Sequence, residues 1–87
     1  MRTAAIITNY NMPERTDALV TYIRKHVKSP VDIVVVDNGS DIVPPSKHTT
    51  LALDSNVQTT GGWLAGLSTL RGDYFAYWFL ITSTAFD

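Results

Sequence analysis

Two runs of β-branched residues, separated by one helix-length segment, constrain this chain most. The first run ends at Thr8 and the second is Ile33-Val34-Val35-Val36, and both pass without alternation into small polar side chains. A strand that is apolar on both faces must be covered on both faces, which is typical of the parallel sheets of α/β proteins. Parallel strands joined by a helix bring their carboxyl ends to one edge of the sheet. We therefore expect the polar residues after the two runs to lie close together.

The rest of the chain continues this alternation of strands and helices. Pro13 suits the first turn of a helix, and a basic cluster before Ser29-Pro30 suits its last turn. The apolar residues expected to face the sheet from this helix are Ala18, Leu19, Tyr22, Ile23 and Val27. We predict a three-layer, Rossmann-like α/β half-domain with a mostly parallel sheet of about four strands. The expected strands are residues 3–8, 31–36, 49–53 and 74–81; the expected helices are residues 13 to about 28 and the segment between Gly61-Gly62 and Gly72, with residues 42–48 irregular.

Length and charge narrow the class of protein. A chain of 87 residues has room for one domain, residues 1–87. Its net charge of -1 creates no field that would attract nucleic acid, and the absence of Cys fits a reducing compartment. The longest apolar stretch, residues 74–81, is much shorter than the ~20 residues of a membrane-spanning helix. We expect a cytoplasmic protein, free or peripheral to the membrane, that binds no nucleic acid.

The last expected strand, Tyr-Phe-Ala-Tyr-Trp-Phe-Leu-Ile, is apolar enough for the middle of a sheet. The sequence continues for only six residues beyond it, so the chain itself offers little to cover its far side. Two explanations remain open. Either the domain is part of a longer chain whose carboxyl-terminal half covers the strand, which we favour, or a homo-oligomer covers it.

The candidate binding residues follow the first two strands. Thr8, Asn9 and Tyr10 offer a hydroxyl, an amide and a ring that can stack on a base. Asp37 and Asn38 can bond to a base or a ribose. Gly39 after them allows a ligand to approach the backbone closely. The alternative is structural, because Asp-Asn-Gly-Ser also favours an Asx-turn in any loop.

A third candidate is the glycine pair Gly61-Gly62. Glycines at the start of a helix leave backbone N–H groups that can point at a diphosphate, and the helix dipole favours negative charge there. The pair fits neither the Gly-x-Gly-x-x-Gly pattern nor a P-loop. Taken by itself, it is more often a tight turn than a phosphate site.

In this order, the motifs resemble the amino-terminal, nucleotide-sugar-binding half of family 2 glycosyltransferases, inverting enzymes with the GT-A fold. The matching segments are Thr8-Asn9-Tyr10-Asn11 with Pro13-Glu14-Arg15, Val34-Val35-Val36-Asp37-Asn38-Gly39-Ser40, and residues 56–66. The third segment is similar to the rhamnosyltransferase-like branch. The resemblance covers nearly all 87 residues. It implies a bacterial-type enzyme of polysaccharide biosynthesis.

The resemblance also implies roles for particular residues. Thr8, Asn9 and Tyr10 would line the nucleotide pocket, Asp37 or Asn38 would contact the base or ribose, and Gly39, Gly61 and Gly62 would lie near the donor. The reaction would transfer a sugar from a nucleotide-sugar to a hydroxyl of an acceptor glycan or glycoconjugate, with inversion. The family's catalytic base lies in the half that would follow this chain, so we assign no catalytic residue and expect the fragment by itself to be inactive.

The end of the last strand departs from the family pattern. The family commonly places an Asp-x-Asp motif there, which holds a divalent metal such as Mg²⁺ or Mn²⁺ against the diphosphate. This chain has Thr82-Ser83-Thr84-Ala85, and hydroxyls are poor ligands for such ions. Asp87 is the one candidate metal ligand nearby. The loss of the acidic pair also fits an alternative function, a non-catalytic α/β module that binds a nucleotide or a protein.

Overall fold

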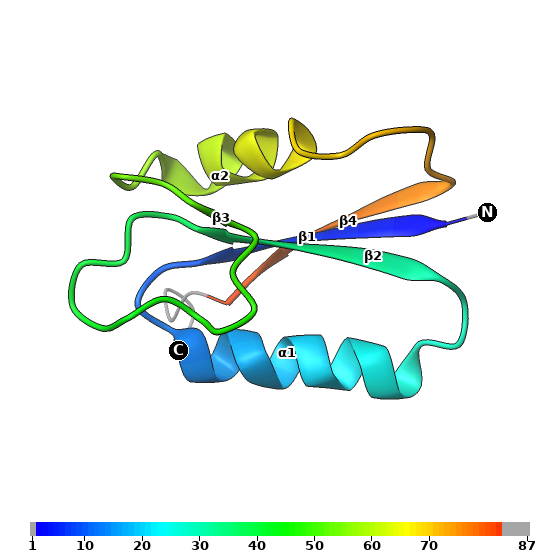
Figure 1. The fold of residues 1–87 in the computed structure, drawn as a ribbon, viewed down its shortest axis with the longest axis horizontal. Coiled ribbons are helices and arrows are strands. Elements are labelled where there is room, and N and C mark those ends of the chain that lie inside the picture. Colours follow the sequence, from blue (N-terminus) through cyan, green and yellow to red (C-terminus); the bar gives the residue numbers. More distant parts are fainter. Residues whose placement is uncertain (1, 83–87) are drawn as a thin grey trace.

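The computed structural model describes residues 2–82 and has three layers, with a sheet between two helices (Figure 1). All described strand pairs are parallel, in the order β3-β2-β1-β4. This confirms the α/β class and the four-stranded parallel sheet, and it is compatible with a Rossmann-like fold. The elements are β1 (Thr3–Asn9), α1 (Pro13–His26), β2 (Val31–Asp37), β3 (Leu51–Ala52), α2 (Gln58–Leu67) and β4 (Ala76–Ile81).

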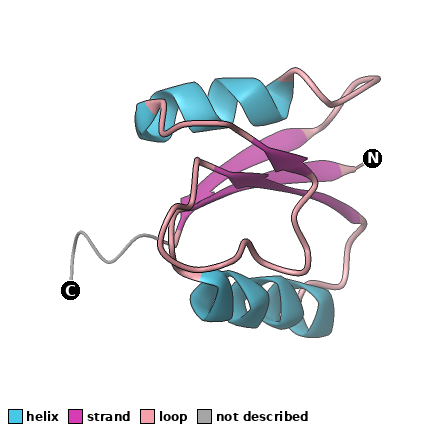
Figure 2. Ribbon diagram, turned by 60° about the vertical axis from the view of Figure 1, so that its left-hand side comes forward, coloured by secondary structure: helices cyan, strands magenta, loops and turns pink. Residues whose placement is uncertain are grey.

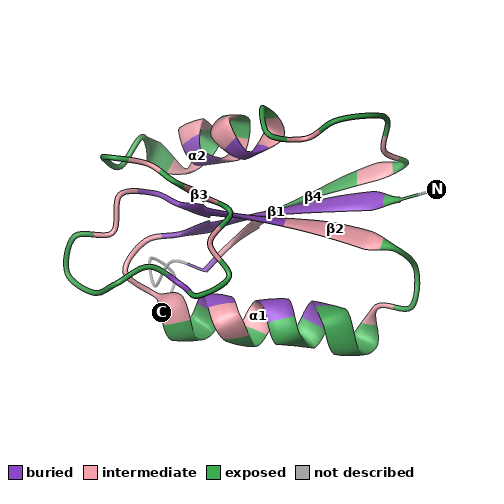
Figure 3. Ribbon diagram, in the orientation of Figure 1, coloured by how far each residue is buried: buried purple, intermediate pink, exposed green. Residues whose placement is uncertain are grey.

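The two helices lie on opposite faces of the sheet (Figure 2). Every residue of β1 is buried, as the absence of alternation predicts (Figure 3). On the α1 side, the core contains Ala5, Ile7 and Val35 of the sheet with Val20 and Ile23 of the helix. On the α2 side, the core contains Ile6, Val34 and Val36, with Trp63 and Leu67 packed against them. Both faces of the central strands are therefore covered by apolar side chains.

The boundaries of α1 and its buried face differ from those expected. The helix ends at His26, and Val27 has extended backbone, so the expected end near residue 28 is two residues too late. Ala18 and Tyr22 are exposed, whereas Thr16 is fully buried. Thr16 is polar, so the apolar pattern of the helix did not include it. Its hydroxyl has buried hydrogen-bond partners, which allow the side chain to face the sheet.

The position of β4 corrects another expectation. Its apolar sequence suggested the middle of a sheet, but β4 lies at the edge, and no strand of the described residues pairs with its outer side. Tyr77, Trp78 and Phe79 are 43%, 36% and 43% exposed. Residues 74 and 75, which we expected in this strand, precede it. Figure 3 shows the resulting contrast between buried β1 and its half-covered neighbour β4.

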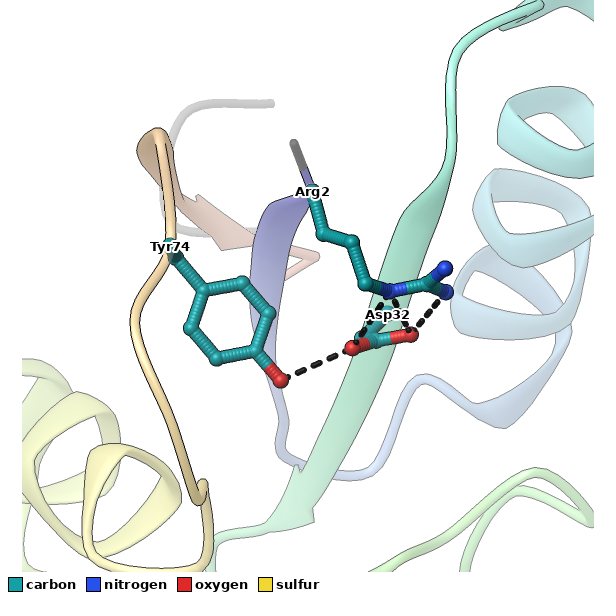
Figure 4. A network of polar contacts seen from close by, with 3 residues as sticks. All are labelled: Arg2, Asp32 and Tyr74. Carbon is teal, nitrogen blue, oxygen red and sulfur yellow. Dashed lines mark hydrogen bonds and ion pairs between the residues drawn. The ribbon is translucent and has the colours of Figure 1, made fainter.

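The amino end of the sheet is tied together by side chains that are exposed or partly exposed (Figure 4). The Arg2 guanidinium donates to both carboxylate oxygens of Asp32 on β2. The Tyr74 hydroxyl, just before β4, donates to the same carboxylate at 2.8 Å. These bonds lower the pKa of Asp32, with the bond from Arg2 as the largest cause. One carboxylate therefore joins the segments that start three neighbouring strands.

The lengths and compositions of the helices were compared with those of a membrane-spanning helix. In residues 2–82, no helix combines the length and the apolar character needed to cross a bilayer. The longer helix, α1, has 14 residues and carries Arg24, Lys25 and His26 in its last turn. Positive charge at that end opposes the helix dipole favourably.

Candidate functional site

A small pocket lies at the carboxyl ends of the strands, and its walls come from four separate segments. Its volume is about 120 Å³. The turn after β1, the residue after β2 and the start of α2 form most of its walls, so the structure brings together segments that the sequence placed in one site. The lining residues are Thr8, Asn9, Tyr10, Asn38, Asn56, Gln58, Thr59 and Ile81.

Asn9 lines this pocket but its side chain is fully buried and engaged. Its Nδ2 donates to Asp37 Oδ1 at 3.0 Å. Its Oδ1 accepts from the Met12 N–H at 3.1 Å and from the Thr16 hydroxyl at 2.9 Å. Asn9 thus joins β1 to β2 and holds the chain where α1 begins. Its amide is buried and bonded within the fold, so Asn9 shapes the wall of the pocket.

Asp37 is 2% exposed, and its carboxylate is used by its own loop. Oδ2 accepts from the Ser40 N–H at 3.0 Å, and Oδ1 accepts from the Ser40 hydroxyl at 2.6 Å as well as from Asn9. The loop therefore uses Asp37 structurally, as in the alternative that we considered, although these bonds reach the residue three positions on and not the N–H two positions on that an Asx-turn uses. Asp37 does not line the pocket, so the structure places it behind the site.

Asn38 and Gly39 connect the loop after β2 to the start of α2. Asn38 Oδ1 accepts from the Val57 N–H and its Nδ2 donates to the Gln58 carbonyl, both at 2.9 Å. Gly39 has φ of +76°, and a Cβ there would lie 2.5 Å from the Ser55 carbonyl carbon. Only glycine fits this close backbone approach. Both residues therefore hold the segment at the start of α2, which forms one wall of the pocket, in position.

The glycine pair lies inside α2, so the expectation that it precedes the helix is wrong. The helix begins three residues earlier, at Gln58. A Cβ on Gly62 would lie 2.8 Å from Thr8 Cγ2 and 3.2 Å from Asn38 Nδ2. Gly62 thus lets α2 pack closely on the ends of the first two strands. A Cβ on Gly61 would meet only the side chain of Val57.

Tyr10 is the predicted site residue whose ring remains half exposed beside the pocket. Its hydroxyl donates to Asp41 Oδ1 at 3.2 Å, which raises the pKa of Tyr10 above its usual value. Bonds from Asn11 and Tyr10 lower the pKa of Asp41. At neutral pH the Tyr10 hydroxyl is therefore protonated and donates to a charged carboxylate. This bond to Asp41 holds the ring at the rim of the pocket.

Asn11, beside Tyr10, holds the loop after β2 in place. It has φ of 57°, and its Oδ1 accepts from the N–H groups of Asp41 and Ile42 at 3.1 and 3.0 Å. Its own N–H donates to the Ser40 hydroxyl at 2.9 Å. The loops after β1 and β2 therefore form one bonded unit at the rim.

The start of α2 contributes residues that we did not single out from the sequence. Asn56, Gln58 and Thr59 line the pocket. Asn56 Oδ1 accepts from the Gln58 N–H at 2.7 Å, which occupies one of the N–H groups that a helix leaves over at its start. The run Asn56-Val57-Gln58 lacks an apolar period, so it carries no signal of a helix. A polar segment directly before a helix was one clue to these pocket residues.

Thr8 and Thr82 join the ends of β1 and β4. The N–H and the hydroxyl of Thr82 both donate to the Thr8 carbonyl, at 3.3 and 3.2 Å. The two hydroxyls of Thr82 and Thr16 lie 2.8 Å apart. Within residues 2–82, no three His, Asp or Glu side chains form a group that could hold a metal ion. Residues 83–87, which include Asp87, lie outside the described residues.

Comparison with family models, curated proteins and solved structures gives no match to this chain. The pocket itself is thus the structural basis for assigning a function to this chain. It lies where parallel α/β sheets hold their ligands, outside the carboxyl ends of the strands. Its volume is below the ~300–1,000 Å³ of typical ligand pockets. These residues can therefore enclose one part of a ligand and leave the rest outside.

Proposed function

We propose that this chain is the donor-binding part of a glycosyltransferase, as its motifs resemble those of family 2 enzymes with the GT-A fold. The observation that carries the proposal is the convergence of the turn after β1, the loop after β2 and the start of α2 on one pocket. In this proposal the pocket receives the base or ribose of a nucleotide-sugar. Tyr10 stacks on the base, and Asn56, Gln58 and Thr59 supply polar contacts.

The proposal assigns indirect roles to the buried residues. Asp37 and Asn38 shape the pocket through their loop and through α2, since both are engaged in bonds within the chain. The diphosphate and sugar extend beyond the 120 Å³ pocket, over the end of β4. The catalytic base and the acceptor site lie outside this chain, and we assign no metal ligand within residues 2–82. A cytoplasmic location, free or at the membrane surface, is part of the same proposal.

Calorimetric titration of the chain with UDP-, GDP- and dTDP-sugars tests the proposal, with and without Mg²⁺ or Mn²⁺. We expect one nucleotide to bind. Base–aromatic stacking contributes ~1–3 kcal/mol, so Tyr10→Ala should weaken that binding about tenfold. Tyr10→Phe is the matched control, because it keeps the ring and removes only the bond to Asp41. Equal affinity in Tyr10→Ala would contradict the stacking role.

A specific observation favours a second candidate, a non-catalytic α/β module. Asn9, Asp37 and Asn38 all use their polar side-chain atoms in bonds that hold the loops together. In a module that binds no nucleotide, holding the loops together would be the whole role of these three side chains. A folded chain that binds none of the nucleotides would overturn the donor-binding proposal and support this module.

A further inference from the structure

Two residues other than glycine have positive φ in the described part of the chain, Asn11 at 57° and Gln58 at 69°. Positive φ is uncommon for residues with a Cβ, although asparagine adopts it more readily than most. A residue that keeps such a conformation is held there by its surroundings, and residues of this kind cluster at binding sites. Each of the two therefore needs a physical reason for its conformation.

The conformation of Asn11 is explained by its own side chain. Its Oδ1 accepts from the N–H groups of Asp41 and Ile42 at 3.1 and 3.0 Å, and its Nδ2 donates to Asp41 Oδ1 at 3.0 Å. These bonds hold the loop after β2 against the turn after β1, and they offset the cost of the positive φ. The fold therefore uses the Asn11 side chain.

Gln58 is held by its backbone and not by its side chain. Its N–H donates to Asn56 Oδ1 at 2.7 Å, and its carbonyl accepts from Asn38 Nδ2 at 2.9 Å. Within residues 2–82, its side-chain amide has no hydrogen-bond partner. A glycine would adopt the same backbone conformation without strain and could form both backbone bonds. The fold therefore does not account for a glutamine at this position.

Gln58 lies in the wall of the pocket at the carboxyl ends of the strands. In the same wall, Asn9, Tyr10 and Asn38 are bonded within the chain, whereas the exposed Gln58 amide offers an N–H donor beside a carbonyl acceptor. The lining residues carry no charge, so none of them supplies the positive charge that favours a diphosphate. An uncharged group with a donor next to an acceptor suits this wall.

We propose that Gln58 binds the edge of the nucleobase through both polar atoms of its amide. Uracil, guanine and thymine each have a carbonyl next to a ring N–H, so the amide N–H donates to that carbonyl and the amide oxygen accepts from the ring N–H. The inference rests on the proposed function, because it names the residue that recognises the enclosed part of the donor. The positive φ is then kept for a contact with the ligand, whereas that of Asn11 is kept for contacts within the fold.

Calorimetric titration with UDP, GDP and dTDP, combined with urea denaturation, tests this role in wild type and Gln58→Gly. The loss of two hydrogen bonds should weaken binding of the preferred nucleotide about tenfold. The urea midpoint should stay equal or rise, because relief of the positive φ offsets the greater freedom of glycine in the unfolded chain. A wild-type chain that binds none of the three overturns the proposed function and this inference with it. Binding by wild type and equal binding by Gln58→Gly overturn the inference alone.

Two further variants separate a ligand contact from a structural role. Gln58→Ala keeps the positive φ and loses the amide, so it should lose the same affinity, and it decides the matter if Gln58→Gly fails to fold. Asn11→Gly is the matched control for strain, because it relieves a positive φ but removes the bonds to Asp41 and Ile42, so its urea midpoint should fall. An equal fall in Gln58→Gly would show that the fold uses the glutamine, and would overturn the inference.

Discussion

The two ends of the sheet are both held together by polar side chains, but in different surroundings. At the carboxyl end, Asn9 and Thr16 are fully buried and Asp37 nearly so. At the amino end, the side chains of Arg2 and Asp32 are 51% and 36% exposed. Removing one partner from a buried hydrogen bond leaves another group unsatisfied and costs its full desolvation, whereas an exposed ion pair contributes little. The difference predicts that the carboxyl end is the rigid one, and it is also the end with the pocket.

The largest effect should come from Asn9→Ala. This change removes three hydrogen bonds and leaves the Met12 N–H without its acceptor. We expect the free energy of unfolding to fall by ~3 kcal/mol, measured by urea denaturation with tryptophan fluorescence. Asn56→Ala is the control at the same end of the sheet. Asn56 is exposed and makes one bond to the Gln58 N–H, so the loss there should stay below ~1 kcal/mol. Equal losses would refute the contrast between buried and exposed bonds.

A smaller effect at the same end should come from Gly62→Ala. The new Cβ would lie 2.8 Å from Thr8 Cγ2, so the helix or the strand must shift. We expect a loss of ~2 kcal/mol, because overpacking outweighs the gain of up to ~1 kcal/mol in helix propensity. Gly61→Ala is its neighbour in the same helix. Its Cβ would lie 2.9 Å from Val57 Cγ2, but Val57 is 43% exposed and can move aside, whereas Thr8 is buried. The gain in helix propensity should offset this contact, so the stability of Gly61→Ala should change little. A stabilised Gly62→Ala would show that α2 does not pack tightly on this end.

The sequence predicted the central strands better than the residues at which the helices begin and end. The strands β1 and β2 were recognisable because continuous β-branched runs need cover on both faces, and the structure confirms that cover. The start of α2 was missed because Gly61-Gly62 resembles a helix breaker. The useful signal was the four-residue spacing of Gly62 and Gly66, since both would place a Cβ against the sheet.

Two other features depend on contacts that no local pattern reports. Apolar composition indicated that β4 needs covering, but the order of strands decides which side is covered, and that order places β4 at an edge. The convergence of the loops after β1 and β2 was predictable from parallel topology. The engagement of Asp37 by Ser40 and Asn9 was not, because a hydrogen bond within the loop and a ligand contact need the same residue types.

The smallest effect should come from Asp32→Asn at the exposed amino end. The pKa of Asp32 is lowered in the folded chain, chiefly by the bond from Arg2 and then by the bond from Tyr74. A lowered pKa stabilises the fold above the unfolded value of about 3.9, and this contribution disappears as the pH falls through the folded pKa. Wild type should therefore be slightly more stable than Asp32→Asn at neutral pH, by much less than the effect of Asn9→Ala.

The pH dependence of this difference identifies its source. Urea denaturation of both chains should give a constant difference from neutral pH down to about pH 5, which then shrinks as the Asp32 carboxylate is protonated. Added salt should reduce the neutral-pH difference as well, because both partners are exposed and screened. A difference that persists unchanged in acid and in salt would mean that Asp32 acts through packing or neutral hydrogen bonds. The two ends of the sheet would then be stabilised by the same kind of interaction.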